Sequence, residues 1–320
     1  MSDHLQGIEV FVAAVEAGSF ARAATRLHLT RSAVGKGIAR LEARLGQRLF
    51  HRTTRHQSLT DEGRQYYAHA RRALDELEAA DSALREGRQE AAGRVRITLP
   101  ELLGRRCAAP LLLALGRRHR GLELRLHLSD SRLNLIEEGL DLALRSGPLE
   151  DSSTLAVRRI GYQSVGVYAA PAYLATHPRP ANAQELIDTH ARHCFLNYAH
   201  GGWVQPWRFH DGADRSIVFD APARFACNSL ELTALAAADG LGLARLPTWL
   251  AAPSVAAGTL VRVFDEPQPF CYPLHLLWPR VPVVPLRLRR VIDMLASELP
   301  PLIDPGRGVD AGPSPSPPDS

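Results

Sequence analysis

The 320-residue chain lacks the features of an exported or membrane-inserted protein. None of its apolar runs approaches the roughly 20 residues that a membrane-spanning helix requires. Its N-terminus has no basic segment followed by an apolar stretch, which is the pattern of a secretory signal. Its only cysteines, Cys107, Cys194, Cys227 and Cys271, are widely scattered rather than paired or clustered. We therefore expect a cytoplasmic protein with reduced thiols and no membrane partner.

The usual sequence signatures of catalysis and of metal or cofactor binding are also missing. The chain has no GxSxG, P-loop, HExxH or Rossmann glycine pattern. His190, His193 and Cys194 are ligand types at close spacing, but no second cluster follows at zinc-site spacing. Trp203 and Trp207 fit core packing better than an aromatic pocket. We expect no catalytic residue, no metal and no cofactor.

Positive charge is concentrated at the N-terminal end of the chain. The composition, 45% hydrophobic and 22% charged, is that of a globular protein, and the length favours two or more domains. The first 60 residues hold nine Lys and Arg against four Asp and Glu, so their net charge is +5. The whole chain has a net charge of +4, so the residues after position 60 together carry −1. A basic segment on a nearly neutral body indicates a module that binds a polyanion.

The basic segment has the spacing of a helix-turn-helix. Apolar residues at helical spacing predict a helix over residues 4–17 that ends at Gly18. Ser19 is placed to cap a short second helix, and Thr30 to cap a third that runs to about residue 45 and stops at Gly46. Two helices joined by a tight turn, the second with a polar face of small residues, are typical of a motif that enters the DNA major groove.

The predicted third helix presents a narrow polar face. Ala33, Gly35 and Gly37 would keep this face slim enough for a groove about 12 Å wide. The alternative is that the glycines only weaken a surface helix, by up to about 1 kcal/mol each. We favour contact with double-stranded DNA, and the predicted contacts are Ser19, Arg22, Thr30, Arg31, Ser32, Ala33, Gly35, Lys36, Arg40, Arg52 and Arg55.

A wing and a long helix are predicted after the third helix. Leu49 and Phe50 should anchor a short strand, and the hairpin beyond it would hold Arg52 and Arg55 over phosphates. From Thr60 to about residue 86 nothing interrupts a helix of about 40 Å. Its apolar stripe favours pairing with a second copy, although packing against the chain's own body is the alternative. The stripe consists of Tyr67, Ala70, Leu74, Leu77 and Leu84.

The remainder of the chain alternates predicted strands and helices. This order favours a largely parallel sheet with helices on both faces. A polar stretch at 88–94 is a plausible hinge, and the Pro- and Ser-rich residues 303–320 are expected to be disordered. Strands are predicted at 94–99, 122–128, 140–144, 164–169, 194–198, 243–246, 260–263 and 274–278, and helices at 102–118, 133–138, 229–239, 248–252 and 286–299.

The basic N-terminal segment, which we call the head, resembles the DNA-binding head of LysR-type transcriptional regulators. One position departs from the family pattern, because Gly35 stands where the family usually has Ser. We therefore expect Lys36 to contribute more of the contacts that recognise the DNA sequence. The matching residues are Ser19, Ala23, Ala24 and Leu27, followed by Ala33-Val34, Ile38, Leu41-Glu42, Leu45-Gly46 and Leu49-Phe50-His51-Arg52.

The resemblance extends to about residue 302, because GRVRITLP, DLALRSG, APAYLATHPRP and AADGLGLARLP resemble segments of the family's effector domain. It implies an α/β protein with a winged helix-turn-helix over 1–61, a linker and dimerisation helix over 60–87, and a two-lobed, periplasmic-binding-protein-like domain over 94–302. Lobe 1 would span about 94–163 and 270–302, and lobe 2 about 164–269.

The function implied by the resemblance is that of a sequence-specific regulator of transcription. A small-molecule effector between the lobes would modulate its DNA binding or promoter activation. The resemblance also implies a homodimer through the linker helix, a homotetramer and contact with RNA polymerase. Two other classes are an enzyme that acts in the cleft, with the head recruiting it to nucleic acid, and a free-standing binding protein. An enzyme is disfavoured because no nucleophile, base and orienting residue converge on one predicted strand end. A free-standing binding protein is disfavoured by the basic head.

Open α/β sheets bind ligands beyond the carboxyl ends of their strands, where helix N-termini offer unpaired N–H groups. The alternative for each such residue is an ordinary turn at a strand end. Glu101 argues against a simple anion site, so a ligand with both a donor and an acceptor, or an aromatic with polar substituents, is preferred. The predicted effector contacts are Thr98, Leu99, Pro100, Glu101, Ser129, Asp130, Ser131, Arg145, Ser146, Gly147, Phe195, Asn197, Asn228 and Ser229.

Overall fold

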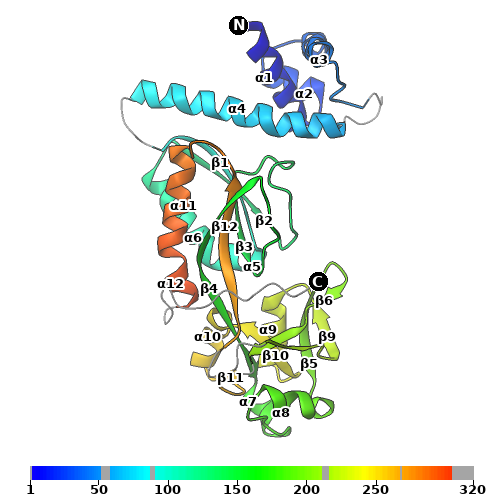
Figure 1. The fold of residues 1–320 in the computed structure, drawn as a ribbon, viewed down its shortest axis with the longest axis vertical. Helices are drawn as coiled ribbons and strands as arrows, with labels where there is room; N and C mark the ends of the chain where they lie inside the picture. Colours follow the sequence, from blue (N-terminus) through cyan, green and yellow to red (C-terminus); the bar gives the residue numbers. More distant parts are fainter. Residues whose placement is uncertain (1, 52–57, 87–90, 211–215, 267–268, 305–320) are drawn as a thin grey trace.

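A computed structural model of the chain describes residues 2–51, 58–86, 91–210, 216–266 and 269–304. Its elements form a helical head, one long helix and a two-lobed α/β body (Figure 1). The head and the body lie on opposite sides of the long helix, and lobe 1 is the lobe next to it (Figure 1). Within the described residues, no helix combines the length and the apolar character that crossing a membrane requires.

The head consists of α1 (Ser2–Ala17), α2 (Phe20–Arg26) and α3 (Arg31–Leu45), and α4 (Asp61–Glu86) packs beneath it. Both predicted caps are confirmed, because Ser19 Oγ accepts from the Arg22 N–H at 3.2 Å and Thr30 Oγ1 accepts from the Ala33 N–H at 3.1 Å. Gly46 ends α3 with a φ of +67°, a conformation that glycine adopts without strain.

The apolar stripe of α4 is partly used inside the chain's own head. Tyr67, Ala70 and Leu74 pack into the head core around the fully buried Phe11. Leu77 is 47% exposed, and the side chain of Leu84 lies outside the described residues. The expectation that the whole stripe would face a second copy is therefore wrong for its first half, because the head covers that half.

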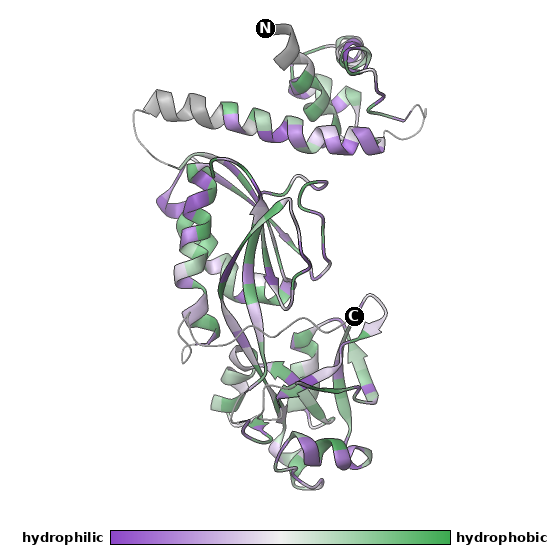
Figure 2. Ribbon diagram, viewed as in Figure 1, coloured by the Kyte–Doolittle hydropathy of each residue, from purple (hydrophilic) through white to green (hydrophobic). Residues whose placement is uncertain are grey.

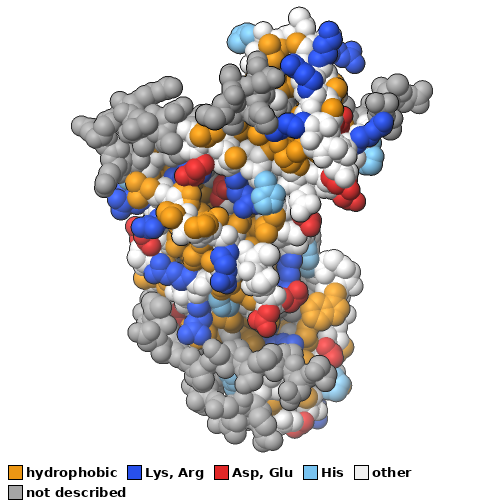
Figure 3. All heavy atoms as spheres, turned by 45° about the horizontal axis from the view of Figure 1, so that its top comes forward, with side chains coloured by type: hydrophobic (Ala, Val, Ile, Leu, Met, Phe, Trp, Pro, Cys, Tyr) orange, Lys and Arg blue, Asp and Glu red, His pale blue; other side chains and the backbone are white. Residues whose placement is uncertain are grey.

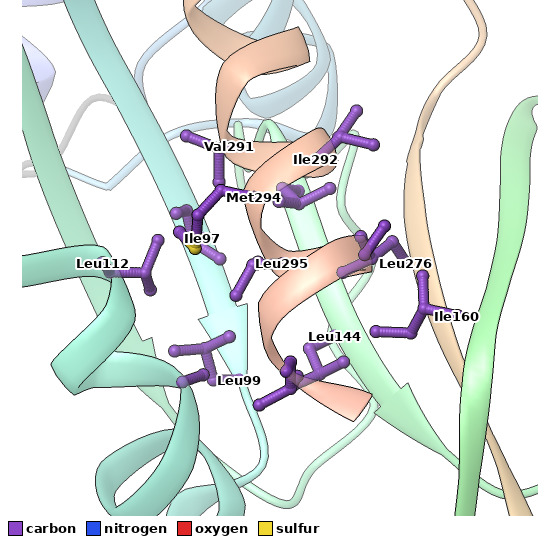
Figure 4. Packing of buried hydrophobic residues seen from close by; sticks show 14 of the residues in the cluster. Ile97, Leu99, Leu112, Leu144, Ile160, Leu276, Val291, Ile292, Met294 and Leu295 are labelled. Carbon is purple, nitrogen blue, oxygen red and sulfur yellow. The ribbon is translucent and has the colours of Figure 1, made fainter. Parts of the chain in front are cut away.

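Lobe 1 is a sheet covered on one face by helices. Its strands are β1 (Gly93–Leu99), β2 (Leu122–Leu128), β3 (Leu142–Ser146) and parts of β4 (Leu155–Ala169) and β12 (Cys271–Pro279). The core between this sheet and the helices contains Leu99, Leu112, Leu144 and Leu295 (Figure 4). The covering helices are α5 (Glu101–Leu103), α6 (Ala109–Arg118), α11 (Leu286–Glu298) and α12 (Pro300–Ile303).

The helix predicted at 102–118 is present, but a π-helical turn at Gly104–Ala108 separates α5 from α6. A Cβ on Gly104 would lie 2.6 Å from the Leu99 Cβ, so only glycine allows this approach to β1. The helix predicted at 133–138 is wrong, because residues 135–139 form turns. An Asn134 side chain that accepts from the Ile136 N–H at 3.1 Å favours a turn there over a helix.

Lobe 2 is built around a second set of strands, which Figure 2 shows to be mostly apolar. It contains β5 (Phe195–His200), β6 (Trp203–Val204), the hairpin β7 (Trp207–His210) and β8 (Ser216–Phe219), β9 (Ala223–Cys227), β10 (Leu243–Pro247) and β11 (Val261–Arg262). Its helices are α7 (Pro171–Leu174), α8 (Ala183–Asp188), α9 (Leu230–Ala238) and α10 (Thr248–Ala256).

Two long strands join the lobes, and they make the sheets less parallel than predicted. β1 pairs in parallel with β2 and β3, and β5 pairs in parallel with β9 and β10. β12, however, is antiparallel to β3 and β4, and β10 is antiparallel to β4. Both β4 and β12 run from lobe 1 into lobe 2 (Figure 1). The expected lobe boundary at 163–164 thus falls inside the continuous strand β4.

Candidate nucleic-acid and effector interfaces

The exposed end of α3 brings the predicted base-reading residues together. Arg31, Ser32, Lys36 and Arg40 are exposed, and Gly35 is half-buried beside them. A Cβ on Gly35 would meet no other atom within 4 Å among the described residues, so this face is open. Lys and Arg side chains gather at the head end of the molecule in Figure 3. The arrangement offers cationic and hydroxyl groups on a slim helix face.

Gly37 does not belong to this face, contrary to the expectation. It is buried, and a Cβ there would lie 3.4 Å from Val10 Cγ1 on α1. The glycine therefore permits the close packing of α3 on α1. Its position three residues after Val34 and four before Leu41 already places it on the apolar stripe.

The remaining predicted DNA contacts flank the turn between the helices. Ser19 and Thr30 use their oxygens as cap acceptors, and each hydroxyl keeps its own O–H to donate to a phosphate. Arg22 is exposed on α2, and Ala33 is half-buried on α3. Arg52 and Arg55 lie outside the described residues.

The base of the wing is held in place by the carboxylate of Glu42, to which the sequence analysis assigned no function. Glu42 Oε1 accepts from the N–H groups of Leu49 at 2.8 Å and of Phe50 at 3.2 Å. Phe50 pairs with Leu59 in an antiparallel bridge, and a Cβ on Gly63 would lie 2.1 Å from the Leu49 oxygen. α3, the wing base and the start of α4 therefore hold one another at fixed positions.

A cluster of charges links the head, α4 and lobe 1, and we call it the junction: Glu16, Arg71, Arg72, Glu76, Asp141 and Arg287. Glu16 of α1 forms a buried ion pair with Arg71 of α4. Arg287 of α11 donates to Glu76 of α4 at 3.0 Å. Asp141 Oδ2, at the start of β3, accepts from the Arg96 N–H at 2.8 Å. Nothing in the sequence pattern indicated these contacts, because their partners are far apart along the chain.

Burial raises the pKa of Asp141 to about 6, although the charges of Arg287, Arg72 and Arg71 act to lower it. Desolvation of the carboxylate thus outweighs the attraction of the nearby arginines. The junction therefore holds a carboxyl group with a pKa of about 6, well above its ordinary value of 3.8.

Several predicted effector residues meet across the boundary between the lobes. Asp130 Oδ1 accepts from the Glu101 N–H at 3.0 Å, and its Oδ2 accepts from Tyr198 Oη at 2.9 Å. Ser131 Oγ lies 3.3 Å from His200 Nε2. Burial and the neighbouring Asp130 carboxylate raise the pKa of Tyr198. Tyr198 and His200 are new to the site, and they occupy the carboxyl end of β5, where a ligand-facing residue is expected.

Four predicted effector residues have side chains in the protein interior and are corrected here. Leu99 and Thr98 are fully buried within β1, and Phe195 packs between the rings of Trp207 and Phe219. Asn197 donates to the Ala221 carbonyl at 2.8 Å and accepts from Trp207 Nε1 at 2.9 Å. The side chains of Leu99, Phe195 and Asn197 are thus occupied by contacts within the lobes, whereas Thr98 Oγ1 is buried without a hydrogen-bond partner in the described structure. Trp207 is a core residue, as expected, but the expectation of core packing is wrong for Trp203, which is 64% exposed on the short strand β6.

The start of α9 is tied to lobe 1 by charge. Ser229 caps the helix by accepting from the Leu232 N–H at 3.2 Å. Glu231, in the first turn, accepts from Arg105 at 2.5 Å and from Arg106, both in the π-helical turn of lobe 1. Asn228 is exposed just before this helix. The N-terminus of α9 therefore faces lobe 1, as predicted, but an acidic residue already holds the nearby cations.

The turn after β3 completes the lobe 1 side of the boundary. Burial lowers the pKa of Arg145, which donates to the Leu144 carbonyl at 3.3 Å. Ser146 is exposed, Pro100 is half-buried, and Gly147 adopts a φ of +101° while donating to the Pro273 carbonyl at 2.9 Å.

Comparisons with known proteins cover both parts of the chain. Residues 5–64 match the family of bacterial regulatory helix-turn-helix proteins of the lysR type, and residues 88–300 match the LysR substrate binding domain. The chain is 33% identical over 300 residues to the HTH-type transcriptional regulator CrgA of Neisseria meningitidis, covering 93% of this chain and 98% of that protein. It is 32% identical over 296 residues to PtxR of Pseudomonas aeruginosa, covering 92% and 93% of the two chains.

Solved structures of full-length regulators have the same architecture. The structure of CrgA from Neisseria meningitidis, described as a LysR-type transcriptional regulator, matches with a TM-score of 0.56 at 32% identity, over 92% of this chain and 98% of that one. The Vibrio cholerae virulence activator AphB matches with a TM-score of 0.56 at 25% identity, over 92% and 99% of the two chains.

Proposed function

The chain belongs to the LysR family of transcriptional regulators, and from this premise we propose how its own residues act. The head binds double-stranded DNA through the exposed end of α3, with Lys36 and Arg31 reaching base edges and Ser19, Arg22 and Thr30 contacting phosphates. A small molecule held between the lobes modulates this binding or the activation of a promoter. The chain works in the cytoplasm as a regulator, without catalysis of its own.

The observation that carries this proposal is the open face of α3. Arg31, Ser32 and Lys36 are exposed together on a helix whose opposite side is buried in the head core. Gly35 leaves space beside Lys36, so the helix can approach the groove closely. The +5 charge of the first 60 residues supplies the attraction to phosphates that is independent of base sequence.

Lys36 can be tested with unusual selectivity, because it is the only lysine among the 38 Lys and Arg of the chain. An amine-reactive reagent should modify the side-chain amine of Lys36 in the free protein, in addition to the N-terminal amine, and DNA that contains the operator should block the modification at Lys36. Lys36→Ala should weaken operator binding roughly 5- to 100-fold, a bidentate base contact being worth about 1–3 kcal/mol, and should weaken binding to random DNA much less.

Two further variants control this test. Arg55→Ala, on the predicted wing, should lower the affinity for operator and random DNA alike and make the affinity less dependent on salt concentration. Arg117→Ala, an exposed arginine at the end of α6, should leave both affinities unchanged. Equal losses of Lys36→Ala on operator and random DNA would remove Lys36 from base reading.

We propose further that two copies pair through the second half of α4, that effector domains join dimers into a tetramer, and that the assembly contacts RNA polymerase. Leu77 supports the first step, because it lies beyond the part of α4 that the head covers and is exposed in the single chain. A long helix with an uncovered apolar stripe is stabilised by a partner helix.

A further inference from the structure

Lobe 2 contains an arginine whose surroundings are unusual for a structural residue. Arg245 lies in the middle strand β10, opposite Val167 of β4, and its side chain is only 6% exposed. Among the described residues, none of its three guanidinium nitrogens has a hydrogen-bond partner. A guanidinium carries five N–H donors, and a buried charge is normally hydrogen-bonded as well as paired.

The groups around Arg245 compensate its charge only in part. Glu266 Oε1 lies 3.7 Å from Nη1, which is too far for a hydrogen bond, and Glu266 is itself 7% exposed. The ring of Phe209 lies over the guanidinium at 4.3 Å from its centroid, and Phe270 lies at 5.9 Å. The rings stabilise the cation through their faces, but they offer nothing to the N–H groups in its plane.

A second arginine lies close to Arg245. Nε of Arg262, on β11, lies 3.8 Å from the exposed carboxylate of Asp265, and Nε and Nη2 of Arg262 are buried without a hydrogen bond in the described structure. Burial raises the pKa of Glu266, although the charges of Arg245 and Arg262 act to lower it. The unpartnered N–H groups of Arg245 are therefore what a further carboxylate would satisfy.

The cluster also adjoins the boundary between the lobes. The ring of Phe270 contacts that of Tyr272, with centroids 5.1 Å apart, and Tyr272 is the second residue of the crossing strand β12. Tyr272 Oη accepts from Gln205 of lobe 2 at 3.3 Å, and a Cβ on Gly147 of lobe 1 would lie 3.8 Å from the Tyr272 ring. Tyr272 therefore connects the surroundings of Arg245 with the boundary between the lobes.

We propose that the effector of this regulator is a flat monocarboxylic acid, and that Arg245 receives its carboxylate between the rings of Phe209 and Phe270. The inference rests on the proposed function, since it names the ligand class of the same effector domain. Arginine binds a carboxylate through two parallel N–H···O bonds, which matches the unpartnered donors of Arg245. The aromatic walls favour a planar apolar body, and the Glu266 carboxylate, 3.7 Å from Arg245, disfavours a second negative charge on the ligand.

The test uses the full chain and a matched pair of probes, benzoate and its uncharged counterpart benzamide. At constant ionic strength, benzoate should raise the thermal unfolding midpoint of the protein, and benzamide should not. Titration calorimetry should show benzoate binding weakened roughly 10- to 100-fold in Arg245→Met, because charge-assisted hydrogen bonds are lost. Arg192→Met, which removes an exposed arginine from the same lobe, should bind benzoate normally.

Glu266→Gln keeps the test decisive if Arg245→Met does not fold. It removes the competing carboxylate while keeping its shape, so it should bind benzoate more tightly than the wild type. If Arg245 and Glu266 formed only a structural pair, Glu266→Gln would gain no affinity for the acid. The proposal is overturned if neither the wild type nor Glu266→Gln distinguishes benzoate from benzamide, or if Arg245→Met binds benzoate as the wild type does.

Operator binding measured with and without benzoate separates this inference from the proposed function. If acids fail to bind while an uncharged compound shifts the affinity for the operator, the inference falls and the regulatory function stands. If benzoate binds at Arg245 without changing operator binding or promoter output, the acid site stands and its role as the effector site falls.

Discussion

Replacing Asp141 with Asn should change how the stability of the protein depends on pH. Asp141 lies at the junction, where its carboxylate accepts from the Arg96 N–H and is approached by the charges of Arg71, Arg72 and Arg287. Asn keeps the size of the side chain and one acceptor oxygen, but it cannot ionise. A comparison of the wild type with Asp141→Asn therefore isolates the ionisation of this one group.

The size and the sign of the effect follow from the pKa of Asp141, which burial raises from 3.8 to about 6. Between these pH values the folded protein binds a proton at Asp141 and the unfolded chain does not, so raising the pH removes stability. A shift of this size corresponds to about 3 kcal/mol, since one pKa unit is worth about 1.4 kcal/mol. The contribution is favourable at low pH and is lost as the pH rises through 6.

The measurement is urea unfolding of both proteins at several pH values between 3.8 and 7, with the difference in unfolding free energy as the result. The wild type should lose about 3 kcal/mol relative to Asp141→Asn across this range. Asp151→Asn, an exposed position in lobe 1, should show no such trend. A difference that stays constant, or that favours the wild type more strongly at neutral pH, would refute the reasoning that burial outweighs the arginines.

Two other predictions concern the head and the assembly. Glu42→Ala should destabilise the head by about 1–3 kcal/mol, because the N–H groups of Leu49 and Phe50 lose their acceptor. Thermal unfolding measures this loss, and Glu62→Ala, which removes an exposed acid on α4, is the control. Leu77→Asp should weaken association, because it places a charge on the uncovered part of the α4 stripe; an unchanged sedimentation coefficient would assign this part of α4 to another role.

The head could be predicted closely because its signals are local. The caps at Ser19 and Thr30 and the left-handed Gly46 each act within a few residues of their position, so the sequence alone locates the helix ends. The prediction for Gly37 is wrong because it rests on the small size of glycine and not on the position of this residue along α3. Gly37 lies three residues after Val34 and four before Leu41, and this spacing from two buried residues places it on the buried stripe.

The effector domain was harder to predict because some of its strands, such as the first half of β5, are buried on both faces. Phe195 and Asn197 alternate as an exposed face would, yet β5 lies between β9 and β10 and both residues are buried. The side chains of β5 that contact lobe 1 are instead near the end of the strand, at Tyr198 and His200. The antiparallel course of β4 and β12 depends on pairing between residues more than 100 positions apart, which no local pattern encodes.

The charged contacts were beyond prediction for a different reason. All but one of the 38 basic residues are arginine, so the sequence does not separate a surface arginine from a buried one. Arginine tolerates both positions, because its planar group can make several contacts at once while its charge persists. Arg71 in the junction and Arg245 in lobe 2 are identified only by what surrounds them.

The position of β3 suggests how a ligand in the effector domain acts on the head. Asp141 of the junction precedes this strand, and Gly147 at the boundary between the lobes follows it, so five residues, or about 17 Å, separate the two. A ligand changes DNA binding only if it favours one arrangement of contacts over another. β3 joins the turn at Gly147 to Asp141, whose carboxylate is approached by the charges of Arg71 and Arg72 of α4. Because Arg71 of α4 also pairs with Glu16 of the head, the same contacts lie between the effector domain and the DNA-reading helix.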